Sequence, residues 1–184
     1  MGTIHHPLPV KLFIGMLSPE PALFDSCAEI LVNEYGPLDH ESALLPWDRT
    51  DYYRDEMGAD ILRKFLFFER TIDPGRLPSI KRFTNAIEDS CAVQNGPAHR
   101  RRINLDPGYV TEAKVVLATT KDFAHRLYIG DDIYAEVTLR YNAKQRSFTP
   151  HEYTFPDYQT REYLELFNRI RINLRAALNR TNRE

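Results

Sequence analysis

The densest group of side chains that could do chemistry lies between Asn104 and Lys121. Lysines and hydroxyl groups suit an anionic ligand, whereas a carboxylate suits a proton or a metal ion. An Asx-type turn followed by an ordinary strand would give the same residues, so both interpretations stay open. The candidate ligand-binding residues in this stretch are Asn104, Asp106, Lys114, Thr119, Thr120 and Lys121.

A predicted β-hairpin follows and adds further candidates. Residues 125–129 and 133–141 alternate as strands around a Gly130-Asp131 turn. On the return strand, strict alternation puts odd-numbered residues on one face and even-numbered residues on the other. If Arg126 and Glu136 face each other, they would line a polar pocket; the alternative is a solvent-exposed ion pair. The candidates here are Arg126, Tyr128, Asp132 and Glu136.

Familiar catalytic and cofactor motifs are absent from the sequence. It contains no P-loop, no G-x-G-x-x-G, no G-x-S-x-G and no H-E-x-x-H. Neither Cys27 nor Cys91 has a C-x-x-C partner, so no metal site is expected. No catalytic set or cofactor can therefore be assigned, and enzymatic activity is left open.

Length, composition and charge limit the classes of protein to which the chain could belong. A chain of 184 residues with 42% hydrophobic and 27% charged residues fits one globular domain, 1–184. The net charge of −2 argues against nucleic acid as a partner, although Arg100-Arg101-Arg102 is a short basic run. The sequence shows neither a signal peptide nor an apolar run long enough for a membrane, which predicts a cytoplasmic location.

Hydrophobic periodicity predicts the elements that must position the candidates. Helices are expected at about 19–36, from 78 until the Asn95-Gly96-Pro97 break, and at 158–179 with Asp157 as the N-cap. A turn is expected at Asp106-Pro107-Gly108. Strands or extended segments are expected at 10–17, 40–47, 52–57, 62–68, 101–105 and 114–118, followed by the hairpin.

This order predicts an α+β fold. Residues 10–105 follow the β-α-β-β-α-β order of a ferredoxin-like unit, with both helices on one face of an antiparallel sheet. Residues 106–184 add a strand, the hairpin and a long helix. Cys27 and Cys91 would lie on neighbouring helices, where reduced thiols in a shared core are expected and a disulfide is the alternative. Aromatic residues between Trp47 and Phe68 are expected in the core, with a base-stacking platform as the alternative.

Several phrases resemble a bacterial family, the Domain of Unknown Function 4416 family, over nearly the whole chain. They are YYRDEMG (52–58), IKRFTNAIE (80–88), RINLDPGYVTEAKVVLATTKD (102–122), HRLYIGDDIYAEVTL (125–139) and EYTFPDY (152–158). What the resemblance implies is limited to the automatic label "GTP-binding protein" that members often carry. No P-loop supports that label, and Thr120-Lys121-Asp122 matches the N-K-x-D guanine reader only in part.

Two functions are therefore expected as alternatives. The first is binding of a small anionic or nucleotide-like ligand without a P-loop, which requires the candidate groups to meet in one concavity. The second is a non-enzymatic interaction or assembly module that uses a sheet edge and the aromatic surface near Trp47 to Phe68, which requires an exposed apolar patch. The oligomeric state is left open. The cations for the first are Lys114, Lys121 and Arg126, and the carboxylates are Asp106, Asp132 and Glu136.

Overall fold

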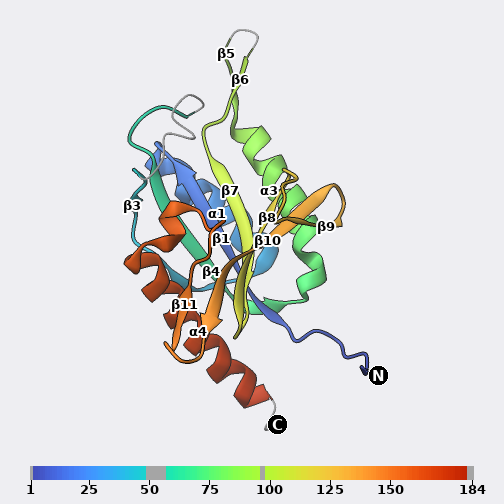
Figure 1. Ribbon diagram of the computed structural model, residues 1–184. Helices are drawn as coiled ribbons and strands as arrows, with labels where there is room; N and C mark the ends of the chain where they lie inside the picture. Colours follow the sequence, from blue (N-terminus) through green and yellow to red (C-terminus); the bar gives the residue numbers. More distant parts are fainter. Residues whose placement is uncertain (1, 49–56, 96–97, 182–184) are drawn as a thin grey trace.

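A computed structural model describes residues 2–48, 57–95 and 98–181 of the chain (Figure 1). Its helices are α1 (Pro21–Tyr35), α3 (Leu77–Cys91) and α4 (Arg161–Thr181), with 3-10 turns η1 (Pro74–Arg76) and η2 (Pro156–Gln159). Its strands are β1 (Val10–Ser18), β2 (Leu38–Glu41), β3 (Leu45–Pro46), β4 (Leu62–Ile72), β5 (Val93–Asn95), β6 (Ala98–Arg100), β7 (Asn104–Val110), β8 (Lys114–Thr119), β9 (Leu127–Gly130), β10 (Ile133–Asn142) and β11 (Ser147–Thr149).

One nine-stranded sheet dominates the molecule and runs in the order β11-β10-β8-β7-β1-β4-β2. Strand β3 pairs with β4, β9 pairs with β10, and β5 and β6 form a separate hairpin. All pairings among the described strands are antiparallel. The predicted mixed fold with a large antiparallel sheet is therefore confirmed.

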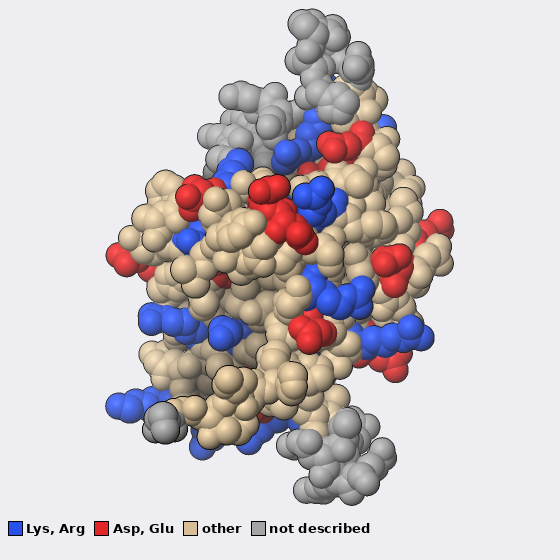
Figure 2. Space-filling view, turned by 90° about the vertical axis from the view of Figure 1, so that its right-hand side faces the viewer, with Lys and Arg blue, Asp and Glu red and all other residues tan. Residues whose placement is uncertain are grey.

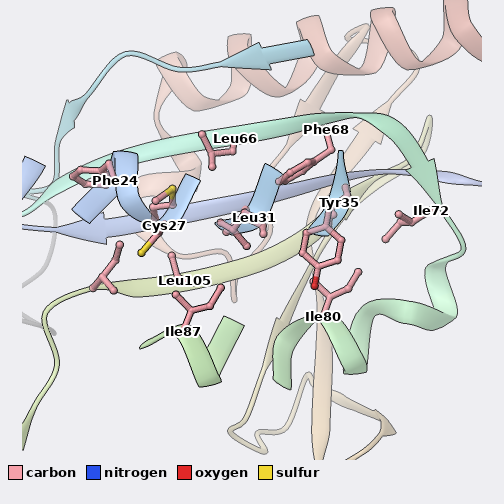
Figure 3. Packing of buried hydrophobic residues seen from close by; sticks show 14 of the residues in the cluster. Phe24, Cys27, Leu31, Tyr35, Leu66, Phe68, Ile72, Ile80, Ile87 and Leu105 are labelled. Atoms are coloured by element: carbon pink, nitrogen blue, oxygen red, sulfur yellow. The ribbon is translucent and has the colours of Figure 1, made fainter. Parts of the chain in front are cut away.

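Helices cover both faces of this sheet (Figure 1). Helices α1 and α3 pack on one face, where alternate β1 residues such as Leu12 and Ile14 join the core (Figure 3). Helix α4 packs on the other face against Phe13, Phe65 and Phe67. Because both faces are covered, all of β1 is buried, which explains its continuous apolar run. We call these surfaces the α1/α3 face and the α4 face.

The aromatic residues of β4 belong to the core, as expected. Phe65, Phe67 and Phe68 have no exposed surface, and Trp47 is buried as well. The predicted extended segment 52–57 lies outside the described residues except for Met57. Cys27 is buried and Cys91 is half-buried, and both are free thiols. Burial and the neighbouring Cys91 raise the pKa of Cys27 to about 12.

The turn predicted at Asp106-Pro107-Gly108 is wrong, because these residues continue β7 and the chain turns at 111–113. Proline is tolerated here because β7 pairs with β8 only from Gly108 onward. Leu105 directs its N–H and C=O away from β1, so the missing N–H of Pro107 would face the same unpaired side. A Cβ at Gly108 would lie 2.3 Å from the carbonyl oxygen of Val116, so this strand position requires glycine.

The hairpin forms as predicted, with two differences. Its loop is Asp131-Asp132, one residue later than expected, and both residues have positive φ, as a type I′ turn requires. A bulge in β10 between Val137 and Leu139 breaks the predicted alternation. Leu139 therefore faces α4, whereas Ile133 packs with α3.

The last helix begins later than predicted. Residues 156–159 form η2, and Thr160 precedes α4 and accepts a hydrogen bond from the Tyr163 amide at 3.4 Å. Asp157 is therefore not the N-cap of α4, because its carboxylate is directed into the core. None of the described helices is long and apolar enough to cross a membrane.

Candidate functional site

A buried arginine lies at the centre of the most unusual polar cluster. Arg63 sits on β4, with its side chain only 3% exposed on the α4 face. Its Nη2 donates a hydrogen bond of 2.9 Å to Asp157 Oδ2, which also accepts one from Trp47 Nε1 at 3.1 Å. The Phe65 ring lies under the guanidinium at 5.3 Å. A buried charge of this kind requires close partners, and Asp157 supplies the first.

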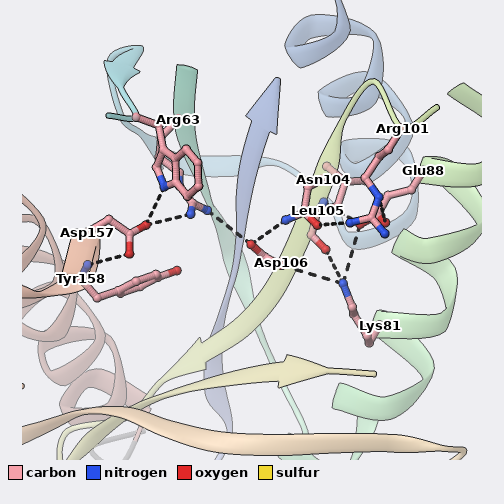
Figure 4. Close-up of polar contacts among 10 residues, drawn as sticks. Arg63, Lys81, Glu88, Arg101, Asn104, Leu105, Asp106, Asp157 and Tyr158 are labelled. Carbon is pink, nitrogen blue, oxygen red and sulfur yellow. Dashed lines mark hydrogen bonds and ion pairs between the residues drawn. The ribbon is translucent and has the colours of Figure 1, made fainter. Parts of the chain in front are cut away.

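A second carboxylate reaches Arg63 across β1. Asp106 on β7 lies directly opposite Gly15 on β1, and Gly15 lies opposite Phe65 on β4. Arg63 Nη1 extends over Gly15 and comes within 3.5 Å of Asp106 Oδ2 (Figure 4). A Cβ at position 15 would lie 2.7 Å from Nη1, so glycine keeps this path open.

Helix α3 extends the cluster on the far side of β7. Lys81 Nζ donates to the Leu105 carbonyl at 2.7 Å, and Glu88 Oε1 accepts from the Leu105 amide at 2.6 Å. The two side chains therefore replace the strand that β7 lacks at this point. Asn104 donates to Asp106 Oδ2 at 2.7 Å, and Lys81 Nζ lies 4.0 Å from Asp106 Oδ1. Asp106 thus joins the Arg63 group to the α3 group (Figure 4).

Three buried hydrogen-bond donor atoms in this cluster, from two residues, lack acceptors. Figure 4 shows the Tyr158 ring below Arg63, with its hydroxyl directed toward Asp106. Within the described structure, the buried Tyr158 hydroxyl and Arg63 Nη1 make no hydrogen bond, and neither does Arg63 Nε. Buried polar groups are normally paired, so an acceptor is missing here. Asp106 is 25% exposed and gives the cluster an outlet to the surface.

Local electrostatics fix the protonation states. Burial alone would lower the pKa of Arg63, but the charges of Asp157 and Asp106 raise it above its ordinary value. Burial raises the pKa of Tyr158 well above its ordinary range, against the opposing charge of Arg63. It also raises the pKa of Tyr163 to about 12. Arg63 and Tyr158 therefore both keep their protons at neutral pH and can donate hydrogen bonds.

The candidates Asn104 and Asp106 belong to this cluster, but the others lie elsewhere. Lys114 and Thr119 occupy opposite ends of β8, roughly 17 Å apart for a six-residue strand. Lys121 follows the Thr119 end, so Lys114 does not meet the other predicted cations. Thr119 Oγ1 accepts the Lys121 amide at 3.2 Å, as in a local turn. The remaining candidates Thr120, Tyr128 and Asp132 lie at exposed or half-exposed positions in turns and on β9.

Arg126 and Glu136 form a second cluster on the hairpin. Arg126 Nε donates to Glu136 Oε2 at 2.8 Å, and the two side chains are 11% and 3% exposed. The pair is therefore buried rather than solvent-exposed. His125 Nε2 lies 3.0 Å from the same oxygen, and its ring stacks on Tyr153 at 4.4 Å. This arrangement ties the hairpin to the segment that leads into η2.

Sequence reasoning missed most of the central cluster. One signal was available, because Arg63 interrupts an apolar strand (LRKFLFF) that is buried on both faces. A charge at such a position requires a buried partner. The sequence could not identify that partner, because Asp157 is 94 residues from Arg63 along the chain. The other missed residues are Lys81, Glu88 and Tyr158.

The described residues contain no group of three or more His, Cys, Asp or Glu side chains that could hold a metal ion. The central cluster balances three cations (Arg63, Lys81 and Arg101) against three carboxylates (Glu88, Asp106 and Asp157). On the face shown in Figure 2, positive and negative side chains are interspersed, without a broad region of one sign.

The fold and the cluster define a mixed α/β protein with one large antiparallel sheet and a buried arginine site. A family model described as "Domain of unknown function (DUF4416)" matches residues 8–173, so the chain belongs to this family, as the resemblance implied. No curated protein and no solved structure matches the chain. The family description gives no activity, and any assignment of function therefore rests on the site.

Proposed function

We propose that the protein binds a small anionic ligand between β7 and η2, with Arg63 and Tyr158 as the groups that contact the anion. The observation that carries this proposal is the pair of buried donors without acceptors. Arg63 Nη1 and the Tyr158 hydroxyl both need an oxygen acceptor, and Asp106 supplies no hydrogen bond to either. An anionic oxygen would satisfy both donors, and such bonds are strong where water is excluded.

The site favours a compact ligand. Arg63 and Tyr158 are buried, and the neighbouring Asp106 side chain is 25% exposed. A carboxylate or a single phosphate group could reach the donors, while Asp106 and Asn104 would contact a hydroxyl or amine of the same molecule. A nucleotide would bind here through its phosphate without a P-loop.

The Tyr158→Phe variant tests the proposal, because it removes only the unpaired hydroxyl. Without ligand, its stability should equal or exceed that of the parent, since an unsatisfied buried group carries a cost of about 1–3 kcal/mol. A thermal-shift screen of carboxylic acids, phosphorylated metabolites, GTP and GDP with magnesium should find a ligand that stabilises the parent. A ligand at about 100 times its Kd adds about 2.7 kcal/mol.

The variant should lose most of that ligand-induced shift. Tyr35→Phe provides the matched control, because Tyr35 is a buried tyrosine on the α1/α3 face. It should respond to the ligand as the parent does. The proposal would be wrong if Tyr158→Phe kept the full response, or if no anion in the screen stabilised the parent.

We also propose that the predicted ferredoxin-like unit of residues 10–105, completed by the rest of β7 to Val110, lies within one domain. The order β7-β1-β4-β2, with α1 and α3 on one face, supports this assignment. The continuous sheet from β2 to β11 supports a single domain.

A second candidate function, a protein-interaction module, is favoured by one surface. Around strand β9, several large hydrophobic side chains are exposed: Phe123 (60%), Leu127 (74%), Tyr128 (61%) and Tyr153 (43%). Leu127 and Tyr128 are consecutive in β9 and so project from its two faces, and exposed apolar side chains beside an edge strand suit protein contacts. A Leu127→Lys variant that abolished a defined complex would support this function.

A further inference from the structure

The antiparallel register places two positive side chains directly opposite each other. Lys114, the first residue of β8, pairs with Arg140 of β10, and both are exposed. Side chains directly opposite in an antiparallel pair have Cβ atoms about 5 Å apart, and like charges at that separation destabilise the sheet. Their neighbours Val115 and Leu139 face α4, so the two cations project from the α1/α3 face.

No carboxylate among the described residues forms an ion pair with either cation. The nearest acidic residue along the chain is Glu112, but its carboxylate pairs with Arg175 of α4 at 3.1 Å. Residues 137–151 contain Arg140, Lys144 and Arg146 and no acidic residue. A local excess of positive charge therefore persists in a chain whose net charge is −2.

We propose that Lys114 and Arg140 form a binding site for a phosphate group. A phosphate carries up to two negative charges on oxygens that point in different directions, so it can contact both side chains and neutralise both. A single carboxylate would leave one positive charge uncompensated. The site is independent of the Arg63 site, because Lys114 lies at the far end of β8 and on the opposite face of the sheet.

Inorganic pyrophosphate is the probe, titrated against the full-length protein by thermal shift. The melting temperature should rise saturably with pyrophosphate. Sodium chloride at equal ionic strength should give a smaller, non-saturating rise, since screening alone relieves repulsion without binding. Equal effects of the two salts would overturn the proposal.

The Arg140→Gln variant tests whether Arg140 binds phosphate or is only an unpaired charge on the surface. Without pyrophosphate it should melt at or above the temperature of the parent, because the repulsion is gone. Its affinity for pyrophosphate should fall by about tenfold or more, the loss expected for a charge-assisted hydrogen bond. Lys114→Gln should behave in the same way.

Arg161→Gln is the control, since Arg161 is an exposed arginine that pairs with Glu165 on α4. It should bind pyrophosphate as the parent does. An unchanged affinity in both Arg140→Gln and Lys114→Gln would refute the site. A short single-stranded DNA that bound at least as tightly as pyrophosphate, and lost affinity in the same variants, would assign the phosphate to a nucleic acid. Weaker DNA binding would support a small phosphorylated molecule.

Discussion

At the scale of single residues, the Arg63–Asp157 pair should dominate the energetics of the site. Removing one partner of a buried ion pair leaves an uncompensated charge and typically costs about 3–5 kcal/mol. We expect Arg63→Met and Asp157→Leu each to destabilise the protein by about this amount in urea denaturation. The double variant should lose less stability than the sum of the two single losses, because neither Arg63 nor Asp157 is then left as a buried charge without its partner.

The double-mutant cycle also has a contrary outcome. Losses that simply add would mean that Arg63 and Asp157 do not interact in the folded protein. The Trp47 indole reports on the same pair, because it donates to Asp157 and is the only tryptophan in the chain. Its fluorescence should therefore shift in the Asp157→Leu variant.

Glu88 should make stability depend on pH. Burial raises its pKa above the ordinary value, although the charge of Lys81 opposes the rise. A raised folded pKa means that the folded state holds the proton more tightly than the unfolded state. The resulting contribution to stability is present below the ordinary glutamate pKa and is lost as the pH rises through the folded value.

A comparison with Glu88→Gln isolates this effect, because glutamine does not titrate. The stability of the parent minus that of the variant should decrease as the pH rises through the folded pKa of Glu88. Urea denaturation at a series of pH values measures this difference. A difference that grew over the same range would mean that the Lys81 interaction outweighs burial.

At the scale of elements, α3 should stabilise the unpaired part of β7. Lys81→Met would leave the Leu105 carbonyl without its buried donor, at a cost of about 1–3 kcal/mol. Arg82→Met, on the exposed side of the same helix, should change stability by no more than about 0.5 kcal/mol. Chemical denaturation gives both values, and equal losses would contradict this role for Lys81.

Local sequence signals predicted the elements better than their connections. The strand β1 was predicted from its continuous apolar run and the helix α3 from its apolar stripe, because each signal lies within the segment itself. The segment Asp106-Pro107-Gly108 was predicted as a turn because of its residue types. A strand can hold Pro107 here only because β8 pairs with β7 from Gly108 onward, and that pairing cannot be seen in the local sequence. The β10 bulge likewise depends on pairing across strands rather than on local residue types.

The site was harder to predict for the same reason. Asn104 and Asp106 were identified because they are polar and close in sequence. Arg63 joins them only through the register of three strands, and Tyr158 approaches from the segment before α4. Lys114 was expected beside them, but it is the first residue of β8 and lies at the end of that strand away from Asp106.

At the scale of the whole molecule, the shared sheet should make unfolding cooperative. Helix α4 packs on strands from both halves of the chain, including β1, β4, β8 and β10. We expect Trp47 fluorescence, which reports on the Arg63 site, and far-ultraviolet circular dichroism to give the same urea midpoint. Separate midpoints would show that residues 10–105 and 106–184 unfold as independent domains.

The side chains that cover Leu105 have a consequence for behaviour in concentrated solution. An unpaired strand edge offers its N–H and C=O groups to any other extended chain and so promotes aggregation. Lys81 and Glu88 occupy both groups of Leu105 with charged side chains from the same molecule. This part of β7 is therefore closed to pairing with a foreign β-strand, although β8 does not cover it.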